Sequence, residues 1–145
     1  MKFFSKGQML VEILVAVGVA VVALLAISRI SSRSIVNVGS AVRQSQASSY
    51  ARSAISVVKN IKNSLGTAAK TDPRLVAGTR CFNGTVINPA ITGYCTIGST
   101  EYSGRVTITQ VTINSKVELG VVAEVQWTEG ALTRTVKNEA KMVFE

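Results

Sequence analysis

The sequence contains no histidine, two cysteines and two prolines among its 145 residues. The lack of histidine excludes a histidine-based catalytic triad and a histidine-ligated metal site. Two cysteines are too few for a four-thiolate metal cage. The sequence also lacks a recognisable nucleophile–base pair, carboxylate dyad or Gly-rich phosphate-binding loop. We therefore expect no enzyme activity, no cofactor and no bound metal.

Acidic residues are scarce, since eight acids stand against 16 bases and the net charge is +8. Nine of the bases lie between Arg29 and Arg80, where Asp72 is the single acid. This balance favours contact with an anionic surface, such as phospholipid headgroups, DNA or an acidic patch on a neighbouring subunit. A solvated helix face explains the same pattern, and the bases lack the interleaved aromatic residues that favour nucleic-acid binding.

Charge is almost absent from Met9 to Ile27, where Glu12 is the one charged residue. As a helix, the stretch from Gln8 to Ile27 would span about 30 Å, the thickness of one hydrocarbon core. An ionised carboxylate in hydrocarbon costs roughly 2.5 to 3.5 kcal/mol on insertion scales. Glu12 therefore predicts a partner that meets it inside the membrane or inside an assembly.

This apolar run differs from an ordinary secretory signal peptide. It is too long, and no A-x-A-like cleavage site ends it. Lys2 and Lys6 precede it, which favours a cytoplasmic amino end, and Arg29 and Arg33 follow it where a helix would enter the headgroups. We expect a single-pass protein of the cytoplasmic membrane.

The segment from Ser5 to Val17, SKGQMLVEILVAV, resembles the class III leader and amino-terminal helix of type IV pilins and pseudopilins. In that family a prepilin peptidase cleaves directly after the glycine, which implies that Gly7 ends the leader and Gln8 begins the mature chain. The resemblance also implies that Glu12 meets the free amino group of an adjacent subunit and sets the axial register of a filament. Pairing of Glu12 with the amino group of its own chain is the alternative.

The resemblance implies a structural subunit of a type IV pilus-like filament, held in the cytoplasmic membrane as a prepilin and then displayed at the cell surface. Its partners would be prepilin peptidase, an inner-membrane assembly platform and further copies of itself. Alternatives are a minor pilin, a type II secretion pseudopilin or, from another class, a monomeric membrane-anchored DNA- or lipid-binding domain. The chain departs from many members at Gln8, where an N-methylated aromatic or Met is common, and at Arg29, where a helix-breaking proline is common.

Beyond the apolar run the pattern becomes amphipathic. No proline occurs between Gln8 and Asp72, so one helix can continue to about Leu65, and Gly66 then supplies a stop signal. One face carries apolar residues at three- and four-residue spacing: Tyr50, Ala54, Val57, Val58, Ile61 and Leu65. The opposite side carries Arg52, Lys59, Lys62 and Asn63. We expect the apolar stripe to pack on a sheet.

The two cysteines enclose a loop rich in turn-forming residues. Because thiols tend to oxidise beyond the membrane, Cys81 and Cys95 predict a disulfide, which would contribute about 3 kcal/mol on the chain-entropy model. Within the loop, Asn83-Gly84-Thr85 matches an N-glycosylation sequon, and an Asn-Gly turn explains the same residues.

Three extended runs follow the cysteine loop. In the first, from Arg105 to Ile113, the apolar alternation slips, which predicts a β-bulge. The second alternates without error from Val117 to Trp127, with Glu118, Glu124 and Gln126 on the outward face and Trp127 in the core. A turn at residues 128–131 leads to the third run, from Leu132 to Phe144. Together they predict an antiparallel meander with one apolar face, covered by the helix stripe.

The sequence thus predicts an α+β fold, in which a long amino-terminal helix, membrane-spanning in its first half, packs on a small antiparallel sheet of three to four strands. The expected divisions are a leader at 1–7, a transmembrane and assembly helix at 8–28, an amphipathic helix at 29–66, a disulfide-closed connecting loop at 67–103 and a β-meander at 104–145.

Overall fold

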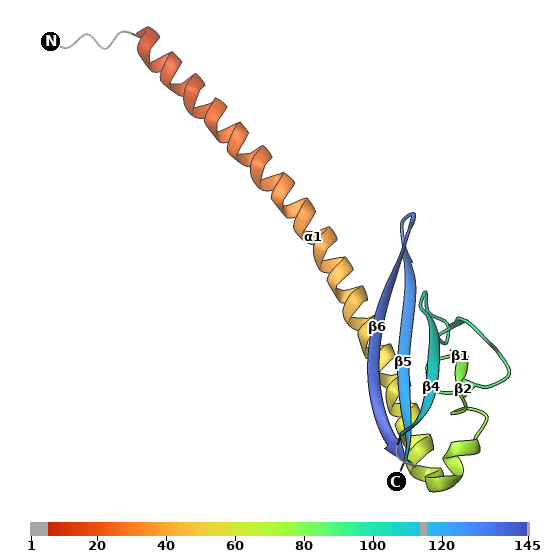
Figure 1. Ribbon diagram of the computed structural model, residues 1–145. Helices are drawn as coiled ribbons and strands as arrows, with labels where there is room; N and C mark the ends of the chain where they lie inside the picture. The colour runs from red at the N-terminus through yellow and green to blue at the C-terminus, as the bar shows by residue number, and fades with distance from the viewer. Residues whose placement is uncertain (1–5, 114–115, 145) are drawn as a thin grey trace. The chain divides into compact units, whose positions relative to one another are not determined.

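The computed structural model describes residues 6–113 and 116–144 of the chain. Most of the expected leader, residues 1–5, therefore lies outside the described residues. The fold is α+β, as predicted. The elements, in chain order, are α1 (Lys6–Leu65), the 3-10 helix η1 (Gly66–Thr71), β1 (Gly78–Phe82), β2 (Ile87–Asn88), β3 (Cys95–Thr96), β4 (Ser103–Ile113), β5 (Lys116–Glu129) and β6 (Leu132–Phe144) (Figure 1).

The chain divides into two compact units, of which the first ends at Val42 and the second begins at Arg43. The first unit holds the amino-terminal part of α1. The second holds the rest of α1 together with η1 and the sheet.

The carboxyl end of α1 follows from local chemistry. Gly66 adopts φ +54°, a left-handed conformation that other residues rarely take, and it ends the α-helix after Leu65. The 3-10 helix η1 then runs to Thr71. The Asp72 carboxylate accepts a hydrogen bond from the backbone N–H of Arg74 at 2.8 Å, which turns the chain back toward the sheet.

The sheet has the strand order β2-β1-β4-β5-β6, with β3 also paired to β4, and all pairs are antiparallel. It therefore has more strands than the three to four predicted. The additional strands β1, β2 and β3 arise in residues 67–103, which were expected to form a connecting loop. They have two to five residues each, too short to produce a detectable alternation of their own.

The predicted bulge in β4 is wrong, because β4 and β5 pair along their described length without a skipped residue. The pattern slips for another reason. Gln110 takes the inward position, where its side-chain Nε2 donates to the carbonyl oxygen of Leu75 at 3.0 Å, so a polar side chain replaces an apolar one there. Val111 and Ile113 consequently lie on the opposite face, each about half exposed.

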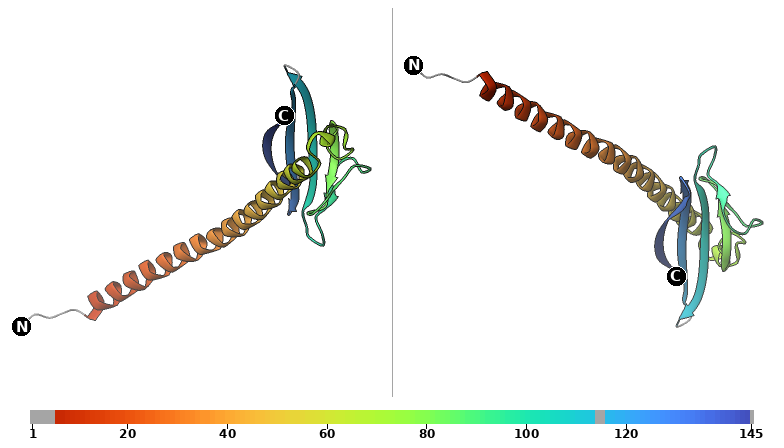
Figure 2. Two further views of the ribbon diagram at one scale, coloured as in Figure 1. Left: turned by 90° about the horizontal axis from the view of Figure 1, so that it is seen from below. Right: turned by 90° about the horizontal axis from the view of Figure 1, so that it is seen from above.

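The carboxyl-terminal section of α1 lies against one face of the sheet, as Figures 1 and 2 show, and the core of the second unit lies between them. The predicted stripe is confirmed at Ala54 and Val58, which are buried, and at its partly buried flanks. Ala47 and Ala51 extend it toward the amino end, and the sequence pattern did not include them. The sheet contributes Val106, Ile108, Leu119, Val121, Ala123, Val125, Trp127 and Phe144.

The close approach of β1 to β4 can be tested at Gly104. A Cβ atom there would lie 2.8 Å from the carbonyl oxygen of Phe82, so the backbone would have to shift. We expect Gly104→Ala to lower the free energy of unfolding by about 1 to 3 kcal/mol, measured by denaturant titration of the full chain in detergent.

Gly39→Ala is the matched control, because a Cβ there meets nothing within 4 Å. A helical Gly-to-Ala change in open space should leave stability unchanged or raise it by up to about 1 kcal/mol. Equal stabilities of Gly104→Ala and the unsubstituted chain would contradict the tight β1–β4 packing.

Candidate functional site

The first unit presents an apolar helix surface. Along α1 from Leu10 to Ile30 none of the side chains is buried inside the molecule, and the stretch is long and apolar enough to cross a membrane. Leu10 and Val22, for example, are 63% and 68% exposed. A helix that is apolar on all sides needs apolar surroundings on all sides, which lipid or neighbouring helices supply.

The three residues expected to act in processing and assembly lie at the start of α1. Gly7 and Gln8 belong to its first turns, where the structure describes the backbone alone. Glu12 follows within the apolar stretch and is exposed. Because successive helical turns repeat every 3.6 residues, Gln8 and Glu12 lie on the same side of the helix. A carboxylate is thus held one turn from the expected new amino end.

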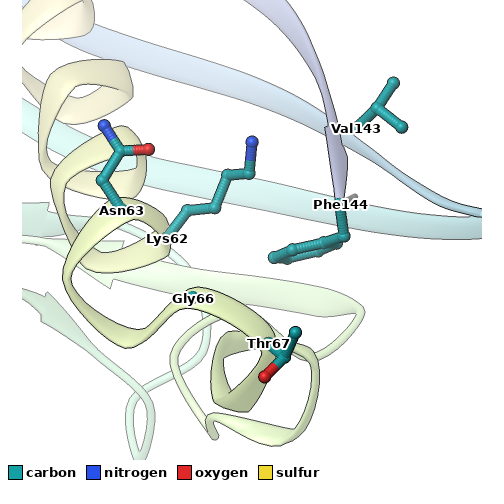
Figure 3. Close-up of a pocket in the computed structure, with 6 residues that line it drawn as sticks. All are labelled: Lys62, Asn63, Gly66, Thr67, Val143 and Phe144. Atoms are coloured by element: carbon teal, nitrogen blue, oxygen red, sulfur yellow. The ribbon is translucent and has the colours of Figure 1, made fainter.

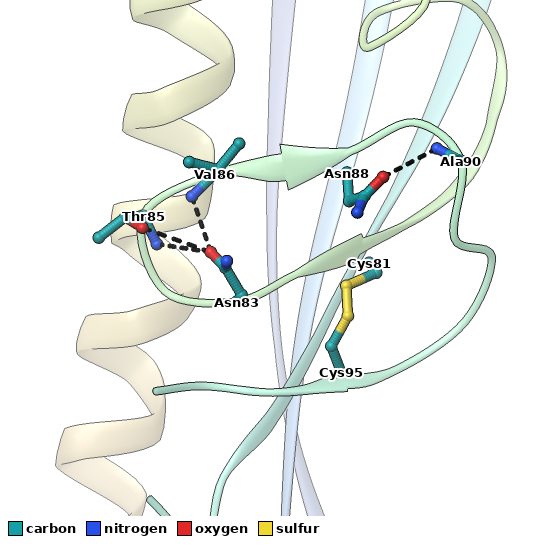
Figure 4. Close-up of a disulfide and its surroundings, with 7 residues drawn as sticks. All are labelled: Cys81, Asn83, Thr85, Val86, Asn88, Ala90 and Cys95. Atoms are coloured by element: carbon teal, nitrogen blue, oxygen red, sulfur yellow. Dashed lines mark hydrogen bonds between the residues drawn. A yellow bond between two sulfur atoms is a disulfide. The ribbon is translucent and has the colours of Figure 1, made fainter. Parts of the chain in front are cut away.

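The predicted disulfide between Cys81 and Cys95 is present (Figure 4). Cys81 lies in β1 opposite Arg105, and Cys95 lies in β3 opposite Gly104, so both cysteines flank the beginning of β4. Their Cα atoms are 5.4 Å apart. The bridge therefore ties two short strands to the main sheet at one place and constrains the loop between them.

The other face of the sheet carries an ion cluster that the sequence pattern missed. Glu124 of β5 lies on the expected outward face, but it is only 4% exposed. Its carboxylate pairs with the Nε of Arg105 on β4 and lies 2.5 Å from the Nζ of Lys137 on β6. The Tyr94 hydroxyl donates to the same carboxylate at 3.3 Å, and the Arg105 guanidinium stacks 4.5 Å from the Tyr94 ring centroid.

Charge and burial shift the pKa of Glu124 in opposite directions. Burial alone would raise the pKa of Glu124, but hydrogen bonds from Arg105 and Lys137 outweigh it and hold that pKa below its ordinary value. Burial, followed by the negative charge of Glu124, raises the pKa of Tyr94. Near neutral pH, Glu124 is therefore an anion between two cations, under a neutral phenol.

Cross-strand register was the signal that could have revealed the cluster. Arg105 lies directly opposite Glu124, and Glu124 lies directly opposite Lys137. Opposite charges at facing positions of antiparallel strands attract each other. Tyr94 could not have been placed in this way, because it precedes β3 and reaches the cluster through the fold of the cysteine loop.

A cavity of about 440 Å³ lies beside the carboxyl end of α1 (Figure 3). Its lining residues are Lys62, Asn63, Gly66, Thr67, Val143 and Phe144. The Lys62 ammonium lies 5.7 Å from the Phe144 ring centroid, so a cation–π contact already engages its charge. Its described lining residues include no carboxylate and no thiol. Among the described residues, no group of three potential ligands could hold a metal.

Four of the bases between Arg29 and Arg80 are held by other groups inside the second unit, two of them in ion pairs. The contacts are Arg43 with Glu101, Arg74 with Asp72, Arg80 with the carbonyl oxygen of Val76, and Lys62 with Phe144. Arg52 and Lys59 are exposed on α1. Fewer of these bases are therefore free to bind an anionic surface than the nine counted in the sequence.

Comparison with protein-family models, with curated proteins and with solved structures gives no significant match for this chain.

The Glu124 cluster predicts a pH-dependent stability. Because the folded-state pKa of Glu124 lies below its ordinary value of 4.5, its contribution is complete above that value and is lost as pH falls through the folded-state pKa. We expect Glu124→Gln to lower the free energy of unfolding at pH 7 by about 1 to 3 kcal/mol and to flatten its pH dependence below pH 5. Denaturant titrations between pH 7 and pH 3 measure both effects.

Glu118→Gln is the control on the same face, since Glu118 lies 3.6 Å from an exposed Lys141. A solvent-exposed pair of this kind contributes less than about 1 kcal/mol. Equal losses of unfolding free energy from Glu118→Gln and Glu124→Gln would show that the buried Glu124 contributes no more to stability than an exposed glutamate.

Proposed function

We propose that this chain is a structural subunit of a type IV pilus-like filament, processed by a prepilin peptidase and polymerised through its amino-terminal helix. The observation that supports it is the exposed apolar surface of α1 from Leu10 to Ile27, within which Glu12 is the one charged residue. An anchor alone has no use for a carboxylate in hydrocarbon, whereas an assembly can supply its partner.

The apolar surface suits exchange between lipid and protein. Lipid tails and neighbouring apolar helices offer similar surroundings, so a subunit can leave the bilayer for a helical bundle at little cost in hydrophobic free energy. Small residues on one side of α1 favour close helix packing. Gly18, Ala23 and Ala26, together with Val19 and Val22, line a shallow depression there. We assign this depression to the same helix of a neighbouring subunit.

Glu12 then sets the register. Cleavage after Gly7 leaves an ammonium group at Gln8, which is the natural counter-charge for a carboxylate in apolar surroundings. Because both charges otherwise lack a polar environment, the stable packing is the axial offset that brings one subunit's Glu12 to another subunit's Gln8. The pair works as a specificity device, as buried polar pairs do in coiled coils.

The second unit fits the far side of the membrane. Its disulfide is typical of an oxidising compartment, and two basic residues precede the apolar stretch, as expected for a cytoplasmic amino end. On this proposal the precursor is a single-pass protein of the cytoplasmic membrane, and assembly moves the second unit to the filament surface.

Removing the Glu12 carboxylate tests its role in assembly. We expect Glu12→Val to leave the protein in the membrane and to lower the yield of sheared filaments about tenfold or more, because the partner charge in the filament then lacks its counter-charge. Quantitative blotting of membrane and sheared fractions measures this ratio.

The double variant Glu12→Val with Ala16→Glu is the matched control. It restores the charge one helical turn further along, so net charge and apolar content are kept and only the axial position changes. A register role predicts that this variant stays defective. Wild-type filament yield from either variant would refute the role of Glu12.

Peptide mass mapping of surface-sheared protein tests processing. Trypsin cuts after lysine and arginine, so a processed chain yields an amino-terminal peptide from Gln8 to Arg29. The peptide from Cys81 to Arg105 contains both cysteines and should be two hydrogens lighter before reduction. An amino-terminal peptide that still carries residues before Gln8 in the sheared material would contradict the proposal.

A further inference from the structure

Asn83 follows β1 at the turn into β2, and the assembly proposal gives it no role. We propose that Asn83 is an N-glycosylation acceptor, modified at its side-chain Nδ2 by a glycan from a lipid-linked glycosyl diphosphate. The inference adds a modification to the second unit and requires only that this unit cross the membrane. Asn83 is exposed, and β2 is one of the edge strands of the sheet.

The geometry of the turn separates the two ends of the Asn83 amide. Its Oδ1 accepts hydrogen bonds from the backbone N–H of Val86 at 2.9 Å and of Thr85 at 3.2 Å, and from the Thr85 hydroxyl at 3.4 Å (Figure 4). The Nδ2 has no hydrogen-bond partner among the described residues. The oxygen is therefore fixed, and the nitrogen that would carry the glycan is presented to solvent.

A turn requirement explains two of the three residues. Asn83 bonds the backbone of the turn, and Gly84 has φ +106° and lies where a Cβ would come within 2.8 Å of the Ile97 side chain. It does not require a threonine at Thr85, because this residue is exposed and its backbone N–H, which any residue except proline would supply, makes the shorter of its two hydrogen bonds to Asn83 Oδ1. The Thr85 hydroxyl on Asn83 Oδ1 is the element that a glycosylation acceptor adds to an Asn-Gly turn.

The transfer balances without a redox partner. Asn83 Nδ2 attacks the anomeric carbon of the donor sugar, a C–N bond forms, and the anomeric C–O bond breaks. The lipid diphosphate leaves with the bonding electrons, and the amide proton passes to a base of the membrane glycosyltransferase. Donors on Oδ1 draw electron density from the nitrogen and make its N–H more acidic, which favours that proton loss.

A glycan at this position would also protect the sheet. β2 stands at one end of the strand order, so its outer side pairs with no strand of the described sheet, and a bulky hydrophilic group beside it would block pairing with another chain. In a filament, where second units are held at high local concentration, this protection has an evident use.

The test is the mass of the tryptic peptide from Cys81 to Arg105 in protein purified from its native cells. We expect the reduced peptide to carry added sugar mass on Asn83, located by fragmentation. Thr85→Val keeps the side-chain shape without the hydroxyl and should lower the modified fraction at least tenfold. Thr85→Ser keeps the hydroxyl and should retain the glycan.

Two results would overturn the inference: an unsubstituted chain whose peptide has the bare polypeptide mass, or sugar that persists in Thr85→Val. Thermal unfolding of both variants shows whether the fold is kept. The amino-terminal peptide reports processing at Gln8 in the same digest, so failure of glycosylation and failure of the assembly proposal are read separately.

Discussion

The apolar stripe of α1 after Arg43, packed on the inner face of the sheet, is the interaction on which the second unit depends. Ala47, Ala51 and Ala54 carry small side chains, so the helix can approach the strands closely along about two turns, and Val58 continues the contact into a third. From Leu10 to Ile30 the same helix is largely apolar and buries none of its side chains within the molecule. The apolar side chains in the first part of α1 can be buried only by other molecules, whereas those after Arg43 are buried by the sheet of the same chain.

The outer face of the sheet is organised by charge and by covalent constraint. Glu124, Arg105 and Lys137 join three neighbouring strands across their facing positions, and Tyr94 covers the carboxylate. Since Tyr94 directly precedes Cys95, the disulfide and the ion cluster hold the same loop from two sides. A domain with a one-layer sheet covered mainly by one long helix has little core, and these contacts add stability on the face of the sheet that α1 leaves uncovered.

Long, regular elements could be predicted from the sequence because many residues in each of them repeat the same spacing of apolar side chains. The helix, the strictly alternating second run and the buried Trp127 were all predicted on this basis and are confirmed. Short elements could not be read in this way. β2 and β3 have two residues each and exist because β1 and β4 offer partners, so their formation depends on residues far along the chain.

The sequence by itself determined the α+β class, an apolar stretch able to span a membrane with one carboxylate, and the pairing of its two cysteines, because these depend on composition and local periodicity. Only the tertiary structure decided that Glu124 is buried, that Gln110 faces inward to bind the Leu75 carbonyl, and that the alternation slip in β4 is no bulge. The physical reason is that burial and hydrogen bonding of a side chain depend on what the fold brings opposite it, and sequence spacing does not report those neighbours.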